Sequence, residues 1–245
     1  MSIDYAVLIQ ARMGSSRAPG KVSHRILGKE MLFHQISRLK INGINNIIIA
    51  TTKNKTDDAI KTIAETCEVN LFRGSENNVL ERFYMAAKGF QIKNIIRVGG
   101  DDPLVDPNCI NALIKHHKQS SANFIYASHK QGWIYGTAAE LIEFKTLEAA
   151  NMLASSSIDK EHVVTYIKDN PQFSQVKISP ENKREIRPDI YLSVDYQEDL
   201  DLIEEILMYF SLKKKLYTFT QSDLIDLYDG GKLNIKNRHL HEGFS

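Results

Sequence analysis

The stretch VLIQARMGSSRAPGK, residues 7–21, joins an apolar segment to a loop rich in glycine, serine and basic residues. The apolar segment, residues 5–10, has the composition of a strand that is buried on both faces. In an open parallel sheet, ligands bind outside the carboxyl ends of the strands, so the loop after the first strand is the first candidate for a ligand-binding loop. Residues 11–21 occupy that place in this chain.

This loop carries groups that bind a polyphosphate. Gly14 and Gly20 let the backbone approach a ligand closely. Hydroxyl groups and positive charge come from Ser15, Ser16, Arg12, Arg17 and Lys21. The spacing excludes a Walker A loop, because five residues separate the two glycines and a valine follows the lysine. The G-x-G-x-x-G pattern of a dinucleotide fingerprint is also absent. Charge supplied by side chains suits an enzyme that holds a departing pyrophosphate.

Outward from this loop, short apolar runs alternate with helical patterns. After the first strand, we expect strands at residues 46–52, 69–72, 94–99 and 123–127, and helices at 31–39, after Thr56, at 77–90 and at 107–117. Strands separated by helices form parallel sheets with right-handed crossovers. The sequence therefore predicts an α/β fold with a Rossmann-like, doubly wound and mostly parallel sheet.

The second half of the chain is less regular. Helices are expected at residues 145–154, 159–168 and 198–210, and strands at 175–178 and 190–194. Because there is no internal repeat and no low-complexity tract, we expect a single domain over residues 1–245.

The composition excludes several classes of protein. The 245 residues are 42% hydrophobic, which is enough to bury a core. Lysine and arginine number 31 against 30 acidic residues, so the net charge of +1 gives no general attraction to nucleic acid. No apolar run is long enough to span a membrane, and the first residues lack a signal-peptide pattern. Cys67 and Cys109 fit neither a metal-binding pair nor a disulfide framework, so we expect a cytoplasmic protein with no membrane partner.

Two acidic stretches complement the basic loop. In RVGGDDPLVDP, residues 97–107, two glycines free the backbone where a strand is expected to end, and Asp101 and Asp102 follow. In YLSVDYQED, residues 191–199, Asp195 ends another apolar run. Carboxylates beside phosphate indicate Mg²⁺, which binds one or two carboxylates together with phosphate oxygens. We predict that Asp101 and Asp195 are the metal ligands, because an unpaired carboxylate at the end of a buried strand is costly.

Other acidic and histidine side chains have simpler interpretations. Glu198 and Asp199 open a helix, where they interact with its dipole. Asp106 precedes a proline and is expected to cap a helix. The histidine pairs at positions 116–117 and 239–241 do not have the arrangement of a zinc site.

Together these motifs resemble the sugar-activating cytidylyltransferases, namely the acylneuraminate and Kdo enzymes and, more closely, the spore coat polysaccharide biosynthesis protein F type. The matching stretches are residues 9–21, 50–52, 74–82, 101–107, 161–163 and 194–199. The resemblance implies a Mg²⁺-dependent enzyme that transfers CMP from CTP to a sugar or an ulosonic-acid-like sugar acid, with release of pyrophosphate, for surface glycan biosynthesis. It also implies a homodimer, in which residues 129–145 form an insertion for dimerisation or for sugar binding.

The resemblance and the loop chemistry together assign the site residues. Catalysis is expected from Arg12, Lys21, Asp101 and Asp195, the last two as ligands of Mg²⁺. The nucleotide is expected to contact Ala11, Arg12, Gly14, Ser15, Ser16, Lys21, Thr51, Arg73, Ser75 and Gly100. The sugar is expected to contact Glu140, Glu161 and His162.

The chain departs from the family pattern at several positions. Ala18, Glu30, Asn78 and Asp102 stand where the family has leucine, proline, aspartate and a small residue or cysteine. Residues 136–142 read GTAAELI in place of a segment of the GxDVEVF type. The motifs assigned to nucleotide binding match the family pattern, whereas those assigned to sugar binding differ from it. The resemblance therefore bears on the reaction more than on the acceptor.

Two other functions stay open. A nucleotidylyltransferase that acts on a sugar 1-phosphate with another nucleoside triphosphate usually begins with a glycine-rich LAAGxGxR loop, which this chain lacks. A non-catalytic nucleotide-binding protein on the same fold would have lost Lys21 or an acidic metal ligand, and these residues are all present.

Overall fold

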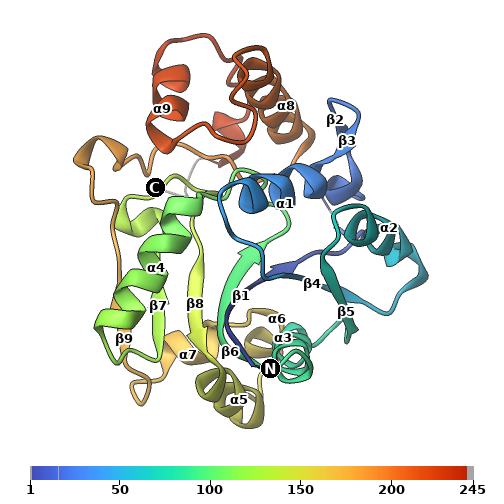
Figure 1. The fold of residues 1–245 in the computed structure, drawn as a ribbon, viewed down its shortest axis with the longest axis vertical. Helices are drawn as coiled ribbons and strands as arrows, with labels where there is room; N and C mark the ends of the chain where they lie inside the picture. Colours follow the sequence, from blue (N-terminus) through green and yellow to red (C-terminus); the bar gives the residue numbers. More distant parts are fainter. Residues whose placement is uncertain (1, 16, 242–245) are drawn as a thin grey trace.

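The computed structural model describes residues 2–15 and 17–241. In this part of the chain, one seven-stranded sheet runs through the molecule in the order β5-β4-β1-β6-β8-β7-β9 (Figure 1). Its strands are β1 (Ile3–Gln10), β4 (Ile47–Thr52), β5 (Asn70–Gly74), β6 (Ile92–Gly99), β7 (Phe124–Tyr126), β8 (Glu140–Glu143) and β9 (Gln175–Lys177). A separate hairpin pairs β2 (Arg25–Ile26) with β3 (Lys29–Glu30).

The sheet is mostly parallel, as the sequence predicts. β1 pairs in parallel with β4 and β6, and β4 pairs in parallel with β5, so the carboxyl ends of these strands meet at one edge of the sheet. The exception is β8, which lies antiparallel between β6 and β7. β8 is not predicted from the sequence, because a run of four residues with glutamate at both ends has no clear strand pattern.

Helices cover both faces of the sheet. One apolar core receives side chains from α1 (Met31–Ile41), α2 (Asp58–Thr66), α4 (Pro107–Gln119), α8 (Gln197–Leu212) and α9 (Gln221–Asp229). The other receives them from α3 (Val79–Gly89), α5 (Phe144–Leu153) and α7 (Thr165–Asp169), and α6 (Ser157–Glu161) lies between α5 and α7 in the chain.

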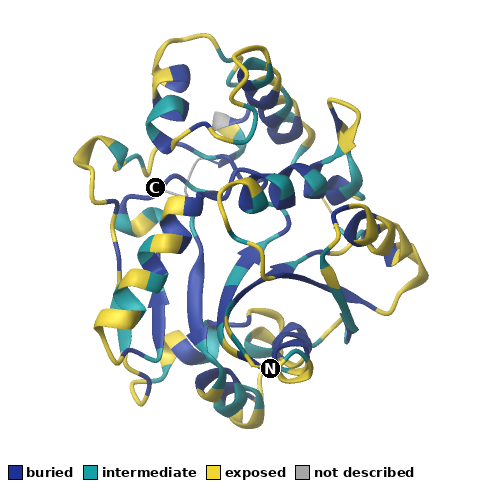
Figure 2. Cartoon of the chain, in the orientation of Figure 1, coloured by how far each residue is buried: buried dark blue, intermediate teal, exposed yellow. Residues whose placement is uncertain are grey.

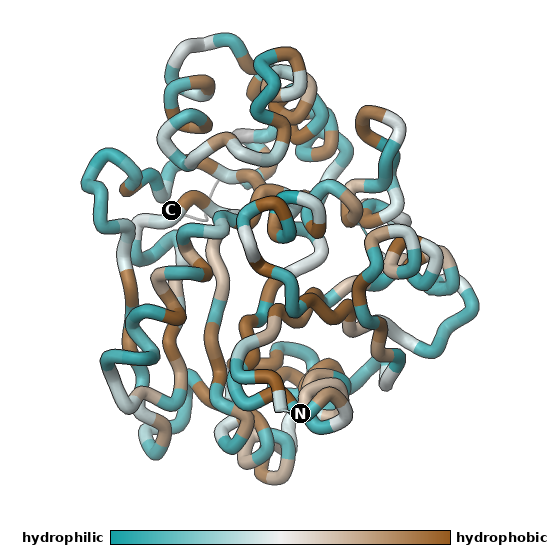
Figure 3. Tube along the Cα trace, viewed as in Figure 1, coloured by the Kyte–Doolittle hydropathy of each residue, from teal (hydrophilic) through white to brown (hydrophobic). Residues whose placement is uncertain are grey.

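Side chains along each strand alternate between these two cores. In β1, Val7 and Ile9 face the first core, whereas Ala6 and Leu8 face the second. The strands are therefore buried on both sides, as Figure 2 shows for the middle of the molecule. Figure 3 shows apolar residues along the same strands.

Other parts of the chain also differ from the sequence prediction. Residues 190–194 lie outside the sheet, and Tyr191 forms an isolated bridge with Tyr135. The expected helix at 159–168 is two short helices, α6 and α7, because Val163 and Val164 turn into the second core between them. α9 forms where no element is expected, and it lies next to α8 at one end of the molecule (Figure 1). No helix of the described residues combines the length and the apolar character needed to cross a lipid bilayer.

Candidate active site

The side chain of Lys21, from the basic loop, contacts both acidic stretches. It begins a short 3₁₀ turn, Lys21–Ser23, and its side chain is buried, with the residue 8% exposed. Its Nζ lies 3.0 Å from Asp101 Oδ2 and 3.5 Å from Asp195 Oδ1, and it also donates a hydrogen bond to the carbonyl oxygen of Val194. Three segments that are far apart in the sequence therefore converge on one ammonium group.

Asp195 is held from several directions. Its Oδ1 accepts a hydrogen bond from Arg17 Nη2 at 2.7 Å, and its Oδ2 accepts one from the Tyr191 hydroxyl at 2.8 Å. Burial, together with this carboxylate, raises the pKa of Tyr191, so the phenol stays protonated and donates. The backbone N–H of Asp195 donates to Asp199 Oδ2 at 2.8 Å.

A cavity of about 380 Å³ opens beside these carboxylates. One group of lining residues, from the loop after β6 and from residues 191–195, is Asp101, Asp102, Ser193 and Asp195, with Arg17 from the basic loop. A second group, from β6, β8, the segment between β7 and β8, and the end of α6, is Arg97, Ser128, His129, Glu140 and His162. The cavity thus joins an acidic wall to a wall with cationic, imidazole and hydroxyl groups.

The second wall contains a charge cluster around Glu140. The Glu140 carboxylate accepts hydrogen bonds from Arg97 Nη1 at 2.8 Å and from Lys168 Nζ at 2.7 Å. Burial alone would raise the pKa of Glu140, but these two ion pairs hold it below its usual value. Arg97 Nη2 donates to Gln10, and its buried Nε has no hydrogen-bond acceptor within the described part of the chain. Of the other expected sugar contacts, His162 lines the cavity, whereas Glu161 is exposed and is not among its lining residues.

Asp102 adds a third carboxyl group to the acidic wall. Burial, and then the neighbouring Asp101 carboxylate, raise the pKa of Asp102. This residue stands where the family pattern has a small residue or cysteine, so the additional carboxyl is a property of this chain.

The nucleotide residues at the end of β1 lie close to the end of β6. Gly100 N donates to the carbonyl oxygen of Gln10 at 2.8 Å, and a Cβ atom on Gly100 would lie 2.9 Å from that oxygen and 3.0 Å from the Ala11 Cβ. This close approach requires glycine at position 100. Arg12 is exposed, and Gly14 and Ser15 follow it in the same loop. Ser16 lies outside the described residues.

Thr51, Arg73 and Ser75 lie at the carboxyl ends of β4 and β5, but their side chains hold the local backbone. Thr51 is buried and its hydroxyl donates to Asp57. The Arg73 guanidinium bonds to the carbonyl oxygens of Thr52 and Asn54 and to the Asp58 carboxylate. Ser75 Oγ accepts from the Asn78 N–H. In this arrangement the three side chains shape the end of the sheet.

Sequence reasoning missed Asp57, which fixes the basic loop. Its buried carboxylate accepts hydrogen bonds from Met13 N at 2.8 Å and from the Thr51 and Thr52 hydroxyls at 3.0 and 2.5 Å. Burial would raise the pKa of Asp57, but these hydrogen bonds hold it below its usual value. Two threonines that end a buried strand a few residues before an aspartate are the signal that could have identified it.

Arg82 of α3 is a buried cation near Arg12 that is not among the site residues expected from the sequence. It is 1% exposed, and its Nη1 donates to the carbonyl oxygen of Ser75 at 2.6 Å. In the described part of the chain, no group accepts a hydrogen bond from its Nε or Nη2. Burial, and then the nearby Arg12, lower the pKa of Arg82 to about 10. Two neighbouring guanidinium groups favour an anion beside them.

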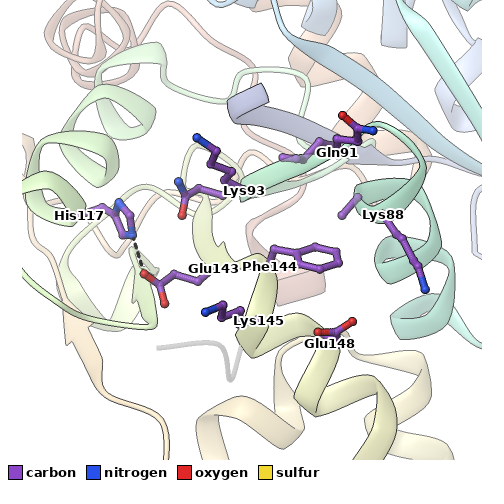
Figure 4. Close-up of a pocket in the computed structure, with 11 residues that line it drawn as sticks. Lys88, Gln91, Lys93, His117, Glu143, Phe144, Lys145 and Glu148 are labelled. Atoms are coloured by element: carbon purple, nitrogen blue, oxygen red, sulfur yellow. Dashed lines mark hydrogen bonds and ion pairs between the residues drawn. The ribbon is translucent and has the colours of Figure 1, made fainter. Parts of the chain in front are cut away.

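A larger cavity, of about 700 Å³, lies at the amino end of β6 (Figure 4). Its lining includes His117, whose Nε2 lies 3.2 Å from Glu143 Oε1, with Lys88, Lys93 and Lys145 around the rim. None of the site residues predicted from the sequence belongs to its lining. Volume alone therefore does not identify the active site.

The acidic wall fits a magnesium ion that is bound together with a phosphate. Asp101 and Asp195 already share one cation, the Lys21 ammonium, and both offer the hard oxygen ligands that Mg²⁺ prefers. Within residues 2–15 and 17–241, no group of three or more histidine, cysteine or acidic side chains could hold a metal alone. Phosphate oxygens and water would complete the coordination, as is usual for Mg²⁺.

Comparisons with known proteins bear on the family of this chain. A sequence model of the cytidylyltransferase family matches residues 6–227. The spore coat polysaccharide biosynthesis protein SpsF of Bacillus subtilis is 31% identical over 211 residues, which are 83% of this chain and 86% of that protein. A 3-deoxy-manno-octulosonate cytidylyltransferase of Pseudoalteromonas translucida is 30% identical over 123 residues, which are 49% of this chain and 48% of that enzyme.

Two solved structures extend the comparison. A cytidylyltransferase of Leptospira borgpetersenii has a TM-score of 0.86 and 27% identity, with 94% of this chain and 95% of that chain covered. A CMP:2-keto-3-deoxy-manno-octonic acid synthetase, solved in complex with CTP, has a TM-score of 0.63 and 16% identity, with 84% and 99% covered, which shows a common fold. From these matches and the site described above, the chain belongs to the cytidylyltransferase family, and it is a nucleotidyltransferase.

Proposed function

We propose that this enzyme transfers CMP from CTP to a sugar acid of the ulosonic type, with Mg²⁺ as cofactor and pyrophosphate as the second product. The observation that carries the proposal is the convergence of Asp101 and Asp195 on Lys21 beside one cavity. The partial match to a 3-deoxy-manno-octulosonate cytidylyltransferase supports a sugar acid as acceptor.

In the proposed reaction, an acceptor oxygen attacks the α-phosphorus of CTP. A new phosphorus–oxygen bond forms, the bond from the α-phosphorus to the bridging oxygen breaks, and its electron pair leaves with pyrophosphate. Mg²⁺, when it is bound, supplies positive charge at the reacting phosphate. Arg12 and Arg82 offer positive charge at the end of the sheet, and Ser15 and the loop backbone offer hydrogen bonds. Lys21 keeps the two carboxylates close together while the phosphates bind.

The second wall of the cavity supports an acidic acceptor. The side chains of Ser128, His129 and His162 line the cavity together with Arg97. A sugar carboxylate would satisfy such donors. Residues 129–145 contribute much of this wall, and Trp133, Ile134 and Leu141 are buried within the chain, so we favour the sugar-binding role for this segment.

The cellular setting is also part of the proposal. We place the enzyme in the cytoplasm, where both buried cysteine thiols would stay reduced. The name of the SpsF relative supports a role in the synthesis of a surface glycan. The homodimer expected from the resemblance stays a prediction, which light scattering on the purified protein would test.

Pyrophosphate release tests the proposal. The enzyme is incubated with Mg²⁺, each of the four nucleoside triphosphates in turn and either 3-deoxy-manno-octulosonate or N-acetylneuraminate. We expect turnover with CTP and a sugar acid, and a loss of at least about 100-fold in kcat for Asp101→Asn and Asp195→Asn. Asp201→Asn, at an exposed position of α8, is the matched control and should keep wild-type activity. Equal activity with a neutral sugar and no effect of Asp195→Asn would contradict the proposal.

A further inference from the structure

Asp199 lies at the centre of a buried polar cluster behind Asp195. It is 1% exposed, and one carboxylate oxygen, Oδ2, accepts hydrogen bonds from the backbone N–H groups of Asp195 and Tyr196, both at 2.8 Å. The other oxygen, Oδ1, accepts from Asn237 Nδ2 at 2.8 Å and from His241 Nε2 at 2.9 Å. Four donors thus converge on one carboxylate.

Capping of α8 explains only part of this cluster. As the sequence predicts, Asp199 is in the first turn of α8, and it bonds back to the N–H of the N-cap residue Tyr196. A cap of this kind needs neither the bond to the Asp195 N–H nor the two donors on Oδ1. These additional contacts connect the start of α8 to residues 237–241.

His241 also contacts the second support of Asp195. Its ring stacks on Tyr191, with the ring centroids 3.4 Å apart and an angle of 15° between the planes. The Tyr191 hydroxyl donates to Asp195 Oδ2. Both groups that hold Asp195 from behind, the Asp199 carboxylate and the Tyr191 ring, therefore contact the same imidazole, which is 8% exposed.

We infer that Asn237 and His241, acting through Asp199 and Tyr191, position the Asp195 carboxylate for a divalent cation. The inference rests on the proposed function, in which Asp195 is a metal ligand. The family model ends at residue 227, so these two supports come from a segment beyond the matched region. They are positioning residues, because neither one lines the cavity.

Binding of Mn²⁺ tests the inference separately from turnover. Electron paramagnetic resonance measures free Mn²⁺ in mixtures with the full-length enzyme and CTP. For an Asn237→Ala/His241→Ala variant we expect a 10- to 100-fold weaker Mn²⁺ affinity, as is typical when a group that orients a ligand is removed. We also expect a lower kcat, while the KM for CTP changes by less than about threefold, because the loop that binds phosphate is untouched. His239→Ala, an exposed histidine in the same turn, is the matched control and should bind Mn²⁺ normally.

Conservative variants separate positioning from simple loss of folding. His241→Gln offers Asp199 an amide donor, and we expect it to recover most of the Mn²⁺ affinity. His241→Phe keeps a ring for Tyr191 but no donor, and we expect it to bind Mn²⁺ more weakly than His241→Gln at an equal melting temperature. A folded double variant with wild-type Mn²⁺ affinity and kcat would overturn the inference and leave the proposed function intact. A wild-type enzyme that binds no Mn²⁺ in the presence of CTP would overturn the metal site, and the inference with it.

Discussion

At the scale of single residues, the buried ammonium group of Lys21 has two roles. Its ammonium neutralises Asp101 and Asp195, and it lies next to the place expected for the phosphates. A guanidinium is planar and larger, so it cannot occupy the same point between the two carboxylates. We expect Lys21→Arg to lose at least about 100-fold in kcat/KM, close to the loss in Lys21→Ala. Steady-state kinetics with CTP measure this, and a Lys21→Arg variant with near wild-type kcat/KM would show that charge alone is sufficient.

Asp102 should make stability depend on pH. Burial and Asp101 raise its pKa in the folded protein above the value of about 3.9 in the unfolded chain. A raised pKa means that the protonated form stabilises the fold below the unfolded value, and that this stabilisation is lost as the pH rises through the folded value. We therefore expect Asp102→Asn to be more stable than wild type at pH 8 without metal, with a smaller difference at pH 5. Urea unfolding at both pH values measures the difference, and equal stability of the two proteins at pH 8 would contradict it.

At the scale of elements, the loop after β1 depends on Asp57 at the start of α2. Asp57→Asn replaces one acceptor oxygen with a donor facing Met13 N or the two threonine hydroxyls. We expect a loss of about 2 kcal/mol in the free energy of unfolding and a higher KM for CTP. Asp58→Asn, which removes only the partly exposed contact with Arg73, should change stability by less than about 1 kcal/mol. Urea unfolding and CTP titration check both variants, and equal effects would contradict a specific role for Asp57.

The elements also show how much of the fold can be predicted from the sequence. The strands of the first half are predicted because their apolar runs face two cores, and the site residues at their ends follow from the parallel sheet. β8 is not predicted because its four residues have no strand pattern of their own. They form a strand through hydrogen bonds to β6 and β7. The apolar run at 190–194 is predicted as a strand, but its apolar side chains join the same core as α8 and it is not a strand of the sheet. The interpretation of Asp199 as a simple helix acid was incomplete, because its partners Asn237 and His241 are set by tertiary structure.

At the scale of the whole molecule, α8 and α9 share the apolar core that covers one face of the sheet. Phe210 of α8 stacks on Phe219 with centroids 4.1 Å apart, and the Arg38 guanidinium of α1 lies 3.9 Å from the Phe219 ring. We expect Phe210→Ala to cost about 4 kcal/mol and to lower the melting temperature of the single transition by about 10 °C. Calorimetry measures this, and a split into two transitions would contradict the single domain expected over the chain.

The two margins of the sheet set a limit on how copies of this protein can associate. β5 and β9, at the opposite ends of the strand order, have five and three residues, so the β9 edge leaves the shorter stretch of unpaired backbone facing outward. Two molecules that paired through β9 would share a ladder along only the three residues of that strand. Very short edge strands are one way in which proteins avoid edge-to-edge association, so we expect contacts between copies to avoid the β9 edge.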